Sequence, residues 1–138
     1  MIYLDSSALM KIVRREDETA ALGEWLVRRP EQQVVSSELA RVEVLRAARW
    51  VGGPVMAEAR AVVADVDLIP LDHAVQDVAC DIGDPALRTL DALHLASALL
   101  LGAQLTAFIA YDHRLADAAR AVGLTVATPG LDPESPPH

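Results

Sequence analysis

The sequence predicts a single α/β domain in which a short central parallel sheet lies between two layers of helices. Short apolar runs alternate with longer segments of helical periodicity, the pattern of strand–helix–strand units. The first run, residues 1–4, is apolar throughout, which is typical of a strand buried on both faces. A chain of 138 residues, 52% of them apolar, suffices for one hydrophobic core but not for two. We therefore expect a three-layer α/β/α domain.

The first half of the chain begins with a strand and continues mainly as helices. Residues 1–4 end at Asp5, and the oxygen side chains of Asp5, Ser6 and Ser7 are suited to cap the helix that follows. A serine at 36 or 37 has the same role for a later helix. In order, we expect a strand over 1–4, a helix from about residue 8, a helix over 17–28, a strand over 33–36 and a helix that reaches residue 50.

Glycine and proline divide the second half of the chain. Gly52-Gly53-Pro54 marks one break, and Gly83-Asp84-Pro85 marks another, with Asp84 suited to cap a helix and Pro85 to its first position. In order, we expect a helix over 54–65, a strand over 67–71, a helix over 72–82, a helix from about 88 to 101, a strand over 105–110, a helix that ends near 123 and a strand over 124–126.

We expect a cytoplasmic protein with no membrane segment. Asp5 interrupts the first apolar run, and no basic segment precedes it. The longest uncharged stretch, 92–110, is split by Gly102-Ala103-Gln104 into a helix and a strand. The single cysteine, Cys80, excludes an internal disulfide and is expected to be a small buried side chain. The domain is expected to span 1–128, with a loose tail over 129–138.

The net charge of −8 disfavours nucleic-acid binding at first sight, because such binding relies on Lys and Arg. The charge is uneven, however: residues 1–50 carry eight basic and eight acidic side chains, whereas residues 51–138 carry four and twelve. Five arginines of the first half either form a local basic rim or are ordinary solvated charges on helix faces: Arg14, Arg15, Arg41, Arg46 and Arg49.

Three aspartates stand where open parallel sheets bind ligands, outside the carboxyl ends of the strands. Asp5 and Asp112 each follow a predicted strand directly, although either could simply cap the next helix. Asp91 lies near a helix start among Leu and Ala residues, where an unpaired ionised carboxylate is costly. The helix dipole offsets that cost by about 0.3–1 kcal/mol, so a structural role for Asp91 stays open.

A fourth acid comes from the helix that reaches residue 50. Glu38 and Glu43 are five positions apart, so they point about 140° apart at 3.6 residues per turn, and only one can face a site. We choose Glu43 because it shares a face with Leu39 and Arg46, whereas Glu38 stands at the helix end near solvent.

Acids that converge from distant parts of a chain repel one another unless a cation binds between them. Oxygen ligands favour hard divalent ions, and such an ion activates a water for attack on phosphorus. The pattern therefore predicts a metal-dependent phosphodiesterase whose ligating and catalytic residues are Asp5, Glu43, Asp91 and Asp112.

Two histidines lie beside these acids. His94 follows Asp91 by three residues on the same helix, and it either supports an acid of the site or is a hydrogen-bonded core histidine. His113, next to Asp112, is a candidate residue at the rim of the site.

Four segments together resemble the successive motifs of PIN-domain nucleases, and in particular VapC-type toxins of bacterial toxin–antitoxin pairs. The resemblance spans residues 1 to about 126. The segments that carry it are Met1–Leu9 (MIYLDSSAL), Glu38–Ala47 (ELARVEVLRA), Leu90–Ala98 (LDALHLASA) and Tyr111–Leu115 (YDHRL). Each motif alone is weak, but four in this order and spacing are specific.

The resemblance implies a PIN-like fold and an Mg²⁺- or Mn²⁺-dependent endoribonuclease. It also implies a homodimer that is held inactive by a VapB-type antitoxin. The four acids of the family map onto Asp5, Glu43, Asp91 and Asp112, and its hydroxyl residue maps onto Ser7 or Ser6. One departure is Ala110, because many members have Thr or Ser just before the Tyr-Asp of the last motif.

Other classes of protein fit the residues less well. A haloacid-dehalogenase-type phosphatase needs a second Asp two residues after the first, where Ser7 stands, and a response-regulator receiver needs a late lysine, whereas the only lysine is Lys11. A PIN-like RNA-processing nuclease without a toxin role stays open. A non-catalytic α/β binding module also stays open if the acids merely cap helices.

Overall fold

A five-stranded, all-parallel sheet organises the computed structural model, which describes residues 1–131. Its strands are β1 (Ile2–Leu4), β2 (Val34–Ser37), β3 (Asp67–Ile69), β4 (Ala107–Ile109) and β5 (Val126–Ala127). Their order in the sheet is β3-β2-β1-β4-β5, with Tyr3 of β1 opposite Val35 of β2 and Phe108 of β4. The chain thus runs outward from β1 to β3, then returns past β1 and continues through β4 to β5.

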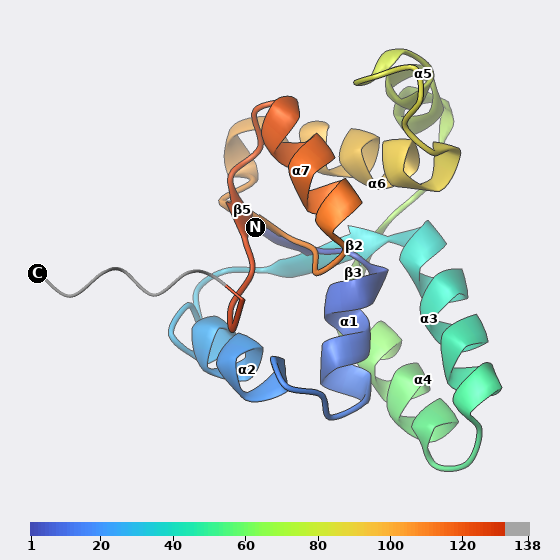
Figure 1. Ribbon diagram of the computed structural model, residues 1–138, viewed down its shortest axis with the longest axis vertical. Coiled ribbons are helices and arrows are strands. Elements are labelled where there is room, and N and C mark those ends of the chain that lie inside the picture. The colour runs from blue at the N-terminus through green and yellow to red at the C-terminus, as the bar shows by residue number, and fades with distance from the viewer. Residues whose placement is uncertain (132–138) are drawn as a thin grey trace, which may run out of the picture.

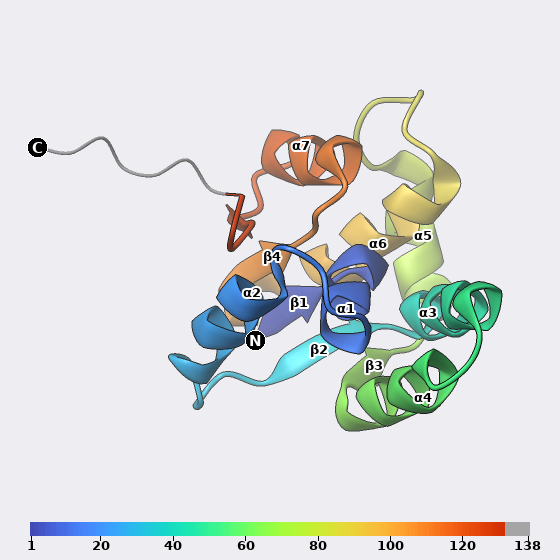
Figure 2. The ribbon, with the colours of Figure 1, turned by 60° about the horizontal axis from the view of Figure 1, so that its bottom comes forward.

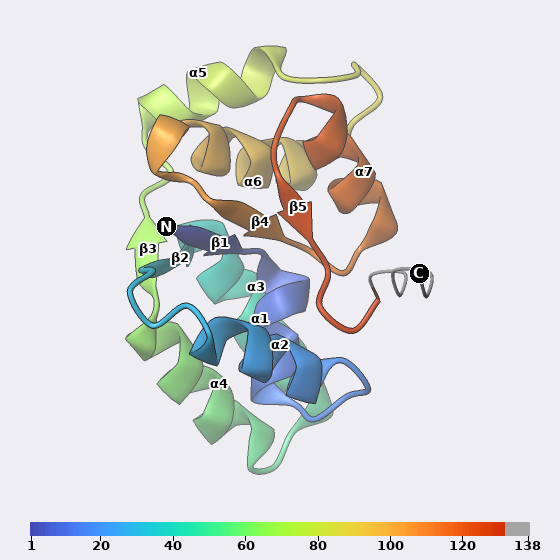
Figure 3. The ribbon, with the colours of Figure 1, turned by 90° about the vertical axis from the view of Figure 1, so that its left-hand side faces the viewer.

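Helices cover both faces of this sheet, which confirms the expected three-layer architecture (Figures 1 and 3). One layer contains α1 (Ser6–Val13), α2 (Thr19–Val27), α3 (Glu38–Val51) and α4 (Val55–Asp65). The opposite layer contains α5 (His73–Asp81), α6 (Thr89–Leu99) and α7 (His113–Ala121). A short 3₁₀ turn, Gly102–Gln104, links α6 to β4. Figure 2 shows α3 and α4 side by side, as their contacts require.

Side chains along β1 point alternately to the two faces of the sheet, so they contribute to two hydrophobic cores, one under each layer of helices. Ile2 and Leu4 face α1 to α4, and Tyr3 faces α6 and α7 with Phe108, whose ring stacks on that of Tyr3 at 5.1 Å between centroids. All three β1 residues are fully buried. The position of Asp5, the residue after β1, is therefore fixed by packing on both faces of the sheet.

Two sequence expectations about this part of the chain are wrong. Asp84 does not cap α6: its Oδ1 accepts the Ala86 N–H in a separate turn, and the helix begins at Thr89 after an extended Arg88. Cys80 is exposed, although it lies near the end of α5. Burial in α5 is limited to Val75, one turn and a half earlier.

The expected tail begins with residues that pack on the domain. Pro129 is buried, and its carbonyl oxygen accepts a hydrogen bond from the Tyr111 hydroxyl at 2.7 Å. Gly130, at φ +93°, lies so close to Glu18 and Ala21 of the α2 region that a Cβ there would stand 3.1 Å from the Glu18 Cβ. Residues 132–138, the rest of the expected loose tail, lie outside the described residues.

Within residues 1–131, no helix combines the length and the apolarity that crossing a bilayer requires. The uncharged stretch that raised this question is divided between α6, the 3₁₀ turn and β4.

Candidate active site

The predicted acids meet at the point where the sheet changes direction. β1 and β4 are neighbours, yet α1 after β1 and α7 after β4 cover opposite faces, so a crevice opens at their carboxyl ends. A pocket of about 290 Å³ occupies this place. It is lined by Asp5, Ser6, Ser7, Glu43, Arg88, Thr89, Leu90, Asp91, His94, Asp112 and Leu115. All four predicted acids are thus brought together.

Asp5 is the most buried of the four acids, with 2% of its surface exposed. Its backbone N–H donates to the Ile109 carbonyl, and its Oδ1 accepts the Ala8 N–H at 2.9 Å and the Ser7 hydroxyl at 2.7 Å. Burial raises the pKa of Asp5 from 3.8 to about 6, although the bonds from Ser7 and Ala8 oppose that rise. Asp5 therefore caps α1 and faces the pocket at the same time.

Ser7 connects the two strands that frame the pocket. Its hydroxyl donates to Asp5 and accepts the Tyr111 N–H at 2.9 Å, which fixes the backbone just after the buried Ala110. The next residue, Asp112, caps α7 by accepting the N–H groups of Arg114 and Leu115 through Oδ1. Its other oxygen, Oδ2, is left on the side of Arg88.

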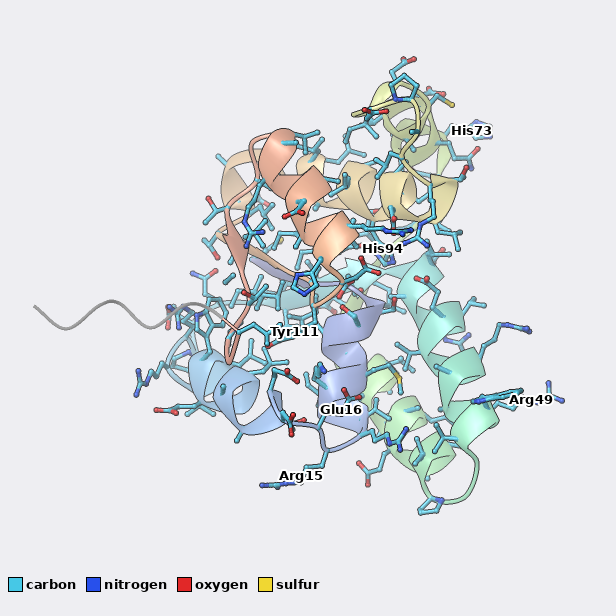
Figure 4. All side chains as sticks on the ribbon, in the orientation of Figure 1. Arg15, Glu16, Arg49, His73, His94 and Tyr111 are labelled. Carbon is cyan, nitrogen blue, oxygen red and sulfur yellow. The ribbon has the colours of Figure 1, made fainter. Side chains whose placement is uncertain are left out.

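Glu43 reaches the pocket from α3 and is held by a buried histidine. Its Oε1 lies 2.7 Å from Nε2 of His94, and Nδ1 of His94 lies 2.7 Å from the Tyr3 hydroxyl. Burial, with the charges of Asp5 and Glu43, raises the pKa of Tyr3 well above its ordinary value, so that hydroxyl keeps its proton and donates a hydrogen bond to Nδ1. We therefore assign to Nε2 the hydrogen that is donated to Glu43. Figure 4 shows His94 where α6 approaches α1 and α3.

Asp91 lies in the first turn of α6, with its side chain 14% exposed. Its Oδ2 is 3.2 Å from Nε of Arg88, and an Nη nitrogen of Arg88 is 3.8 Å from Oδ2 of Asp112. A positive guanidinium therefore stands between two of the acids. Arg88 is the only Arg or Lys that lines the pocket within residues 1–131.

The donor set suits a hard divalent cation, because four carboxylates from four segments line one pocket and oxygen is the ligand such ions prefer. Within residues 1–131, however, no three His, Cys, Asp or Glu side chains approach closely enough to share one ion. The four acids therefore have the right chemistry and line the same pocket, but Asp91 and Asp112 are positioned by their contacts with Arg88.

The remaining sequence candidates divide between this pocket and other surfaces. Ser6 and Ser7 line the pocket, as expected of supporting residues. His113 is exposed and does not line it, because it is the first residue of α7 and the helix turns its side chain outward. Arg46 lies around a separate depression with Arg49 and Trp50, and Figure 4 shows Arg49 extending outward from α3. Glu38 is likewise outside the pocket, with Oε2 3.5 Å from the Leu71 N–H.

Sequence reasoning missed two residues of the site, Tyr3 and Arg88. Tyr3 is the one polar tip in an otherwise aliphatic strand, and such a hydroxyl needs a partner when it is buried. Arg88 precedes Asp91 by three positions, a spacing that brings side chains together on a helix. Both signals were readable, but neither specifies which partner the side chain finds.

Comparison with known proteins places the chain among proteins of similar length. The PIN domain family matches residues 2–121. Ribonuclease VapC35 of Mycobacterium tuberculosis is 43% identical over 132 residues, which cover 94% of this chain and 98% of that protein. Ribonuclease VapC47 of the same organism is 43% identical over 133 residues, with the same coverage.

Solved structures share the fold at low sequence identity. FitAcB from Neisseria gonorrhoeae superposes with a TM-score of 0.72 at 15% identity, over 94% of this chain and 98% of that one. VapBC-5 from Mycobacterium tuberculosis, a toxin–antitoxin system, gives 0.55 at 18% identity, over 91% and 94%. With the family match over residues 2–121 and relatives at 43% identity along almost the whole length, this chain belongs to the PIN domain family, in its VapC branch.

Proposed function

We propose that this chain is an endoribonuclease that uses Mg²⁺ or Mn²⁺ to hydrolyse RNA phosphodiester bonds. The observation that carries the proposal is the convergence of Asp5, Glu43, Asp91 and Asp112 in one pocket at the carboxyl ends of β1 and β4. The relatives named ribonucleases, at 43% identity, support RNA as the substrate.

In this proposal the four carboxylates would hold the cation in the pocket. When bound, such an ion would supply an activated water and stabilisation of the leaving oxygen, and hydrolysis by water would leave 5′-phosphate and 3′-hydroxyl ends. The chain itself fixes the carboxylates: Ser7 orients Asp5, and Nε2 of His94 donates a hydrogen bond to Glu43. Such supporting hydrogen bonds to ligands commonly change metal affinity or activity by about 10- to 100-fold.

We also propose that the enzyme is the toxin of a type II toxin–antitoxin pair. A VapB-type antitoxin is then its partner, a homodimer its assembly and the cytoplasm, where RNA is accessible, its compartment. The supporting observations are the VapC relatives and the similarity in fold to VapBC-5, a member of a family of toxin–antitoxin systems. A PIN-like nuclease without a toxin role predicts the same pocket but no growth arrest on expression.

Cleavage of RNA by the purified chain tests the enzymatic proposal. The wild type is incubated with total RNA in Mn²⁺ and in EDTA, and the new ends are sequenced. Asp91→Asn is the inactive variant, and Asp117→Asn is the matched control, because Asp117 is an exposed acid of α7 outside the pocket. We expect Mn²⁺-dependent 5′-phosphate ends from the wild type and the control only.

Two results decide between the proposed classes. Cleavage that persists in EDTA or in Asp91→Asn would contradict the metal-dependent site. Absence of cleavage by the wild type under all conditions would leave a non-catalytic α/β binding module as the better account. Expression of the same variants in a bacterial host, with and without the antitoxin, separates a toxin from an RNA-processing nuclease.

A further inference from the structure

The positively charged side chain of Arg88 contacts two acids of the pocket, Asp91 and Asp112. Arg88 places Nε 3.2 Å from Oδ2 of Asp91 and an Nη nitrogen 3.8 Å from Oδ2 of Asp112. Asp91 is on α6 and Asp112 precedes α7, so a single guanidinium joins the two helices at the mouth of the pocket. No other residue in the described chain makes this link.

The position of Arg88 makes its side chain easy to displace. Arg88 is the N-cap residue of α6, with an extended backbone and no side-chain cap hydrogen bond to the helix backbone. Its side chain is 58% exposed, against 14% for Asp91, so the guanidinium approaches the acids from the solvent side. Exposed ion pairs of this kind are weak and exchange readily.

A divalent cation and the guanidinium compete for the same carboxylate oxygens. Both are positive, and a hard ion needs the lone pairs of Asp91 that now accept a hydrogen bond from Nε of Arg88. A free guanidinium at this place would stand beside the substrate, and its planar fork of donors matches the oxygens of a phosphate. The same side chain can therefore pair with the carboxylates before the cation binds and with an RNA phosphate afterwards.

We propose that Arg88 is the resident counter-ion of Asp91 and Asp112, that the divalent cation displaces it, and that the released guanidinium then binds an RNA phosphate. This inference rests on the proposed ribonuclease function. It accounts for two features together: four acids line one pocket, yet no three of those described are close enough to share an ion while Arg88 bridges two of them.

The first test measures cation binding without RNA. Metal-free wild type, Arg88→Ala and Arg120→Ala are titrated with Mn²⁺ by isothermal titration calorimetry. Arg120→Ala is the matched control, because Arg120 makes a similar exposed pair with Asp117 at 3.3 Å, three residues apart on α7 and outside the pocket. We expect Arg88→Ala to bind Mn²⁺ about two- to fivefold more tightly, since a weak competing ion pair is removed.

The second test measures RNA binding without cleavage. The variant Glu43→Gln is combined with Arg88→Ala or with Arg120→Ala, and a labelled single-stranded oligoribonucleotide is titrated by fluorescence anisotropy in saturating Mn²⁺. We expect Arg88→Ala to weaken binding and to reduce the slope of log affinity against log salt by about 0.7, the loss of one phosphate contact on a single strand. The Arg120→Ala combination should match Glu43→Gln alone.

The proposal requires both shifts. It is overturned if Arg88→Ala binds Mn²⁺ no more tightly than Arg120→Ala, or if its RNA affinity and salt slope equal those of the control. Failure of the proposed function has a different signature, namely wild-type protein that binds no Mn²⁺ or cuts no RNA. Because Arg88 makes no cap bond and its side chain is mostly exposed, Arg88→Ala is expected to fold, and its circular dichroism checks this.

Discussion

Asp5 is under two opposing influences, because it caps α1 while its carboxylate is almost fully buried. The backbone and Ser7 donate hydrogen bonds to one of its oxygens, but burial still raises its pKa from 3.8 to about 6. The folded protein therefore holds this proton more tightly than the unfolded chain does. Stability that Asp5 contributes below about pH 4 is lost as the pH rises towards 6, by at most about 3 kcal/mol.

Replacement of Asp5 by Asn should consequently stabilise the metal-free protein at neutral pH. The amide oxygen can still accept from Ala8 and Ser7, while the buried charge is removed. We expect the free energy of unfolding to rise by about 1–3 kcal/mol at pH 7.5 and the two proteins to converge near pH 4. Urea denaturation in EDTA measures this, with Asp117→Asn as the control. A less stable Asp5→Asn at pH 7.5 would show that the cap outweighs the buried charge.

Glu43 and Glu38 provide a matched pair on one helix. Glu43 lines the pocket and accepts from His94, whereas Glu38 lies outside it beside Leu71. We expect Glu43→Gln to reduce the rate of RNA cleavage by at least about 100-fold, the effect of losing a metal ligand or a residue that orients one. We expect Glu38→Gln to change the rate by no more than about twofold. Initial rates on a fluorogenic oligoribonucleotide measure both. Equal losses in the two variants would mean that Glu38 moves into the site.

At the residue scale, the sequence was most informative where chemistry constrains it. An acid directly after a buried strand, as in Asp5, can be recognised because few residues are tolerated there without a partner. Arg88 escaped prediction because an exposed Arg three positions from an Asp is common, and its contact with Asp112 depends on tertiary structure. Cys80 is exposed and not buried as expected, because α5 buries only Val75.

At the scale of elements, a buried chain of hydrogen bonds links β1, α6 and α3 through Tyr3, His94 and Glu43. The hydroxyl of Tyr3 sets the tautomer of His94, and His94 then donates to the acid. Each element contributes one side chain, so this chain of hydrogen bonds depends on how α6 and α3 pack on the sheet. No single segment of the sequence contains all three residues.

Tyr3→Phe should break this chain at its buried end. Nδ1 of His94 would lose its donor, and its proton would no longer be confined to Nε2. We expect a loss of about 1–2 kcal/mol in stability, and about a tenfold loss in cleavage because Glu43 is oriented less well. The ¹⁵N chemical shifts of the His94 ring report the tautomer directly. Tyr111→Phe, which removes a hydroxyl bonded to Pro129, is the control, and an unchanged His94 spectrum in Tyr3→Phe would contradict the assignment.

The boundaries of elements were predicted to within a few residues, and their exceptions have local causes. The first helix begins at Ser6 because Asp5 itself is the cap. The strand expected over 105–110 forms as β4 only over Ala107–Ile109, and Leu105 instead caps the preceding 3₁₀ turn by donating its N–H to the Gly102 carbonyl. Pro85 suggested a helix start, but the extended Arg88 delays α6 until Thr89.

For the whole molecule, alternation of strands and helices predicts a parallel sheet but not the order of its strands. The order β3-β2-β1-β4-β5 puts the first and fourth strands side by side, and this brings Asp5 within one pocket of Asp112, more than 100 positions later. The sequence showed that acids follow strands. Only the topology shows that these strands are neighbours and that the acids therefore meet.

The cation that this pocket is proposed to bind should also stabilise the folded state of the whole molecule. A ligand at 100 times its dissociation constant stabilises the folded state by about 2.7 kcal/mol, which for a domain of this size raises the melting temperature by about 5–10 °C. We expect Mn²⁺ to produce such a shift at pH 7.5 in the wild type and in Asp117→Asn, but not in Asp91→Asn. The comparison is made by differential scanning calorimetry against EDTA.

The same shift should depend on pH in a direction that Asp5 determines. Because the pKa of Asp5 is raised to about 6, its carboxylate takes up a proton as the pH falls through that value and is lost as a ligand. We expect the Mn²⁺ increment to decrease between pH 7 and pH 5, well before exposed carboxylates titrate near pH 4. An increment that stays constant down to pH 5 would mean that the cation binds without Asp5, at the more exposed acids, Asp112 and Glu43.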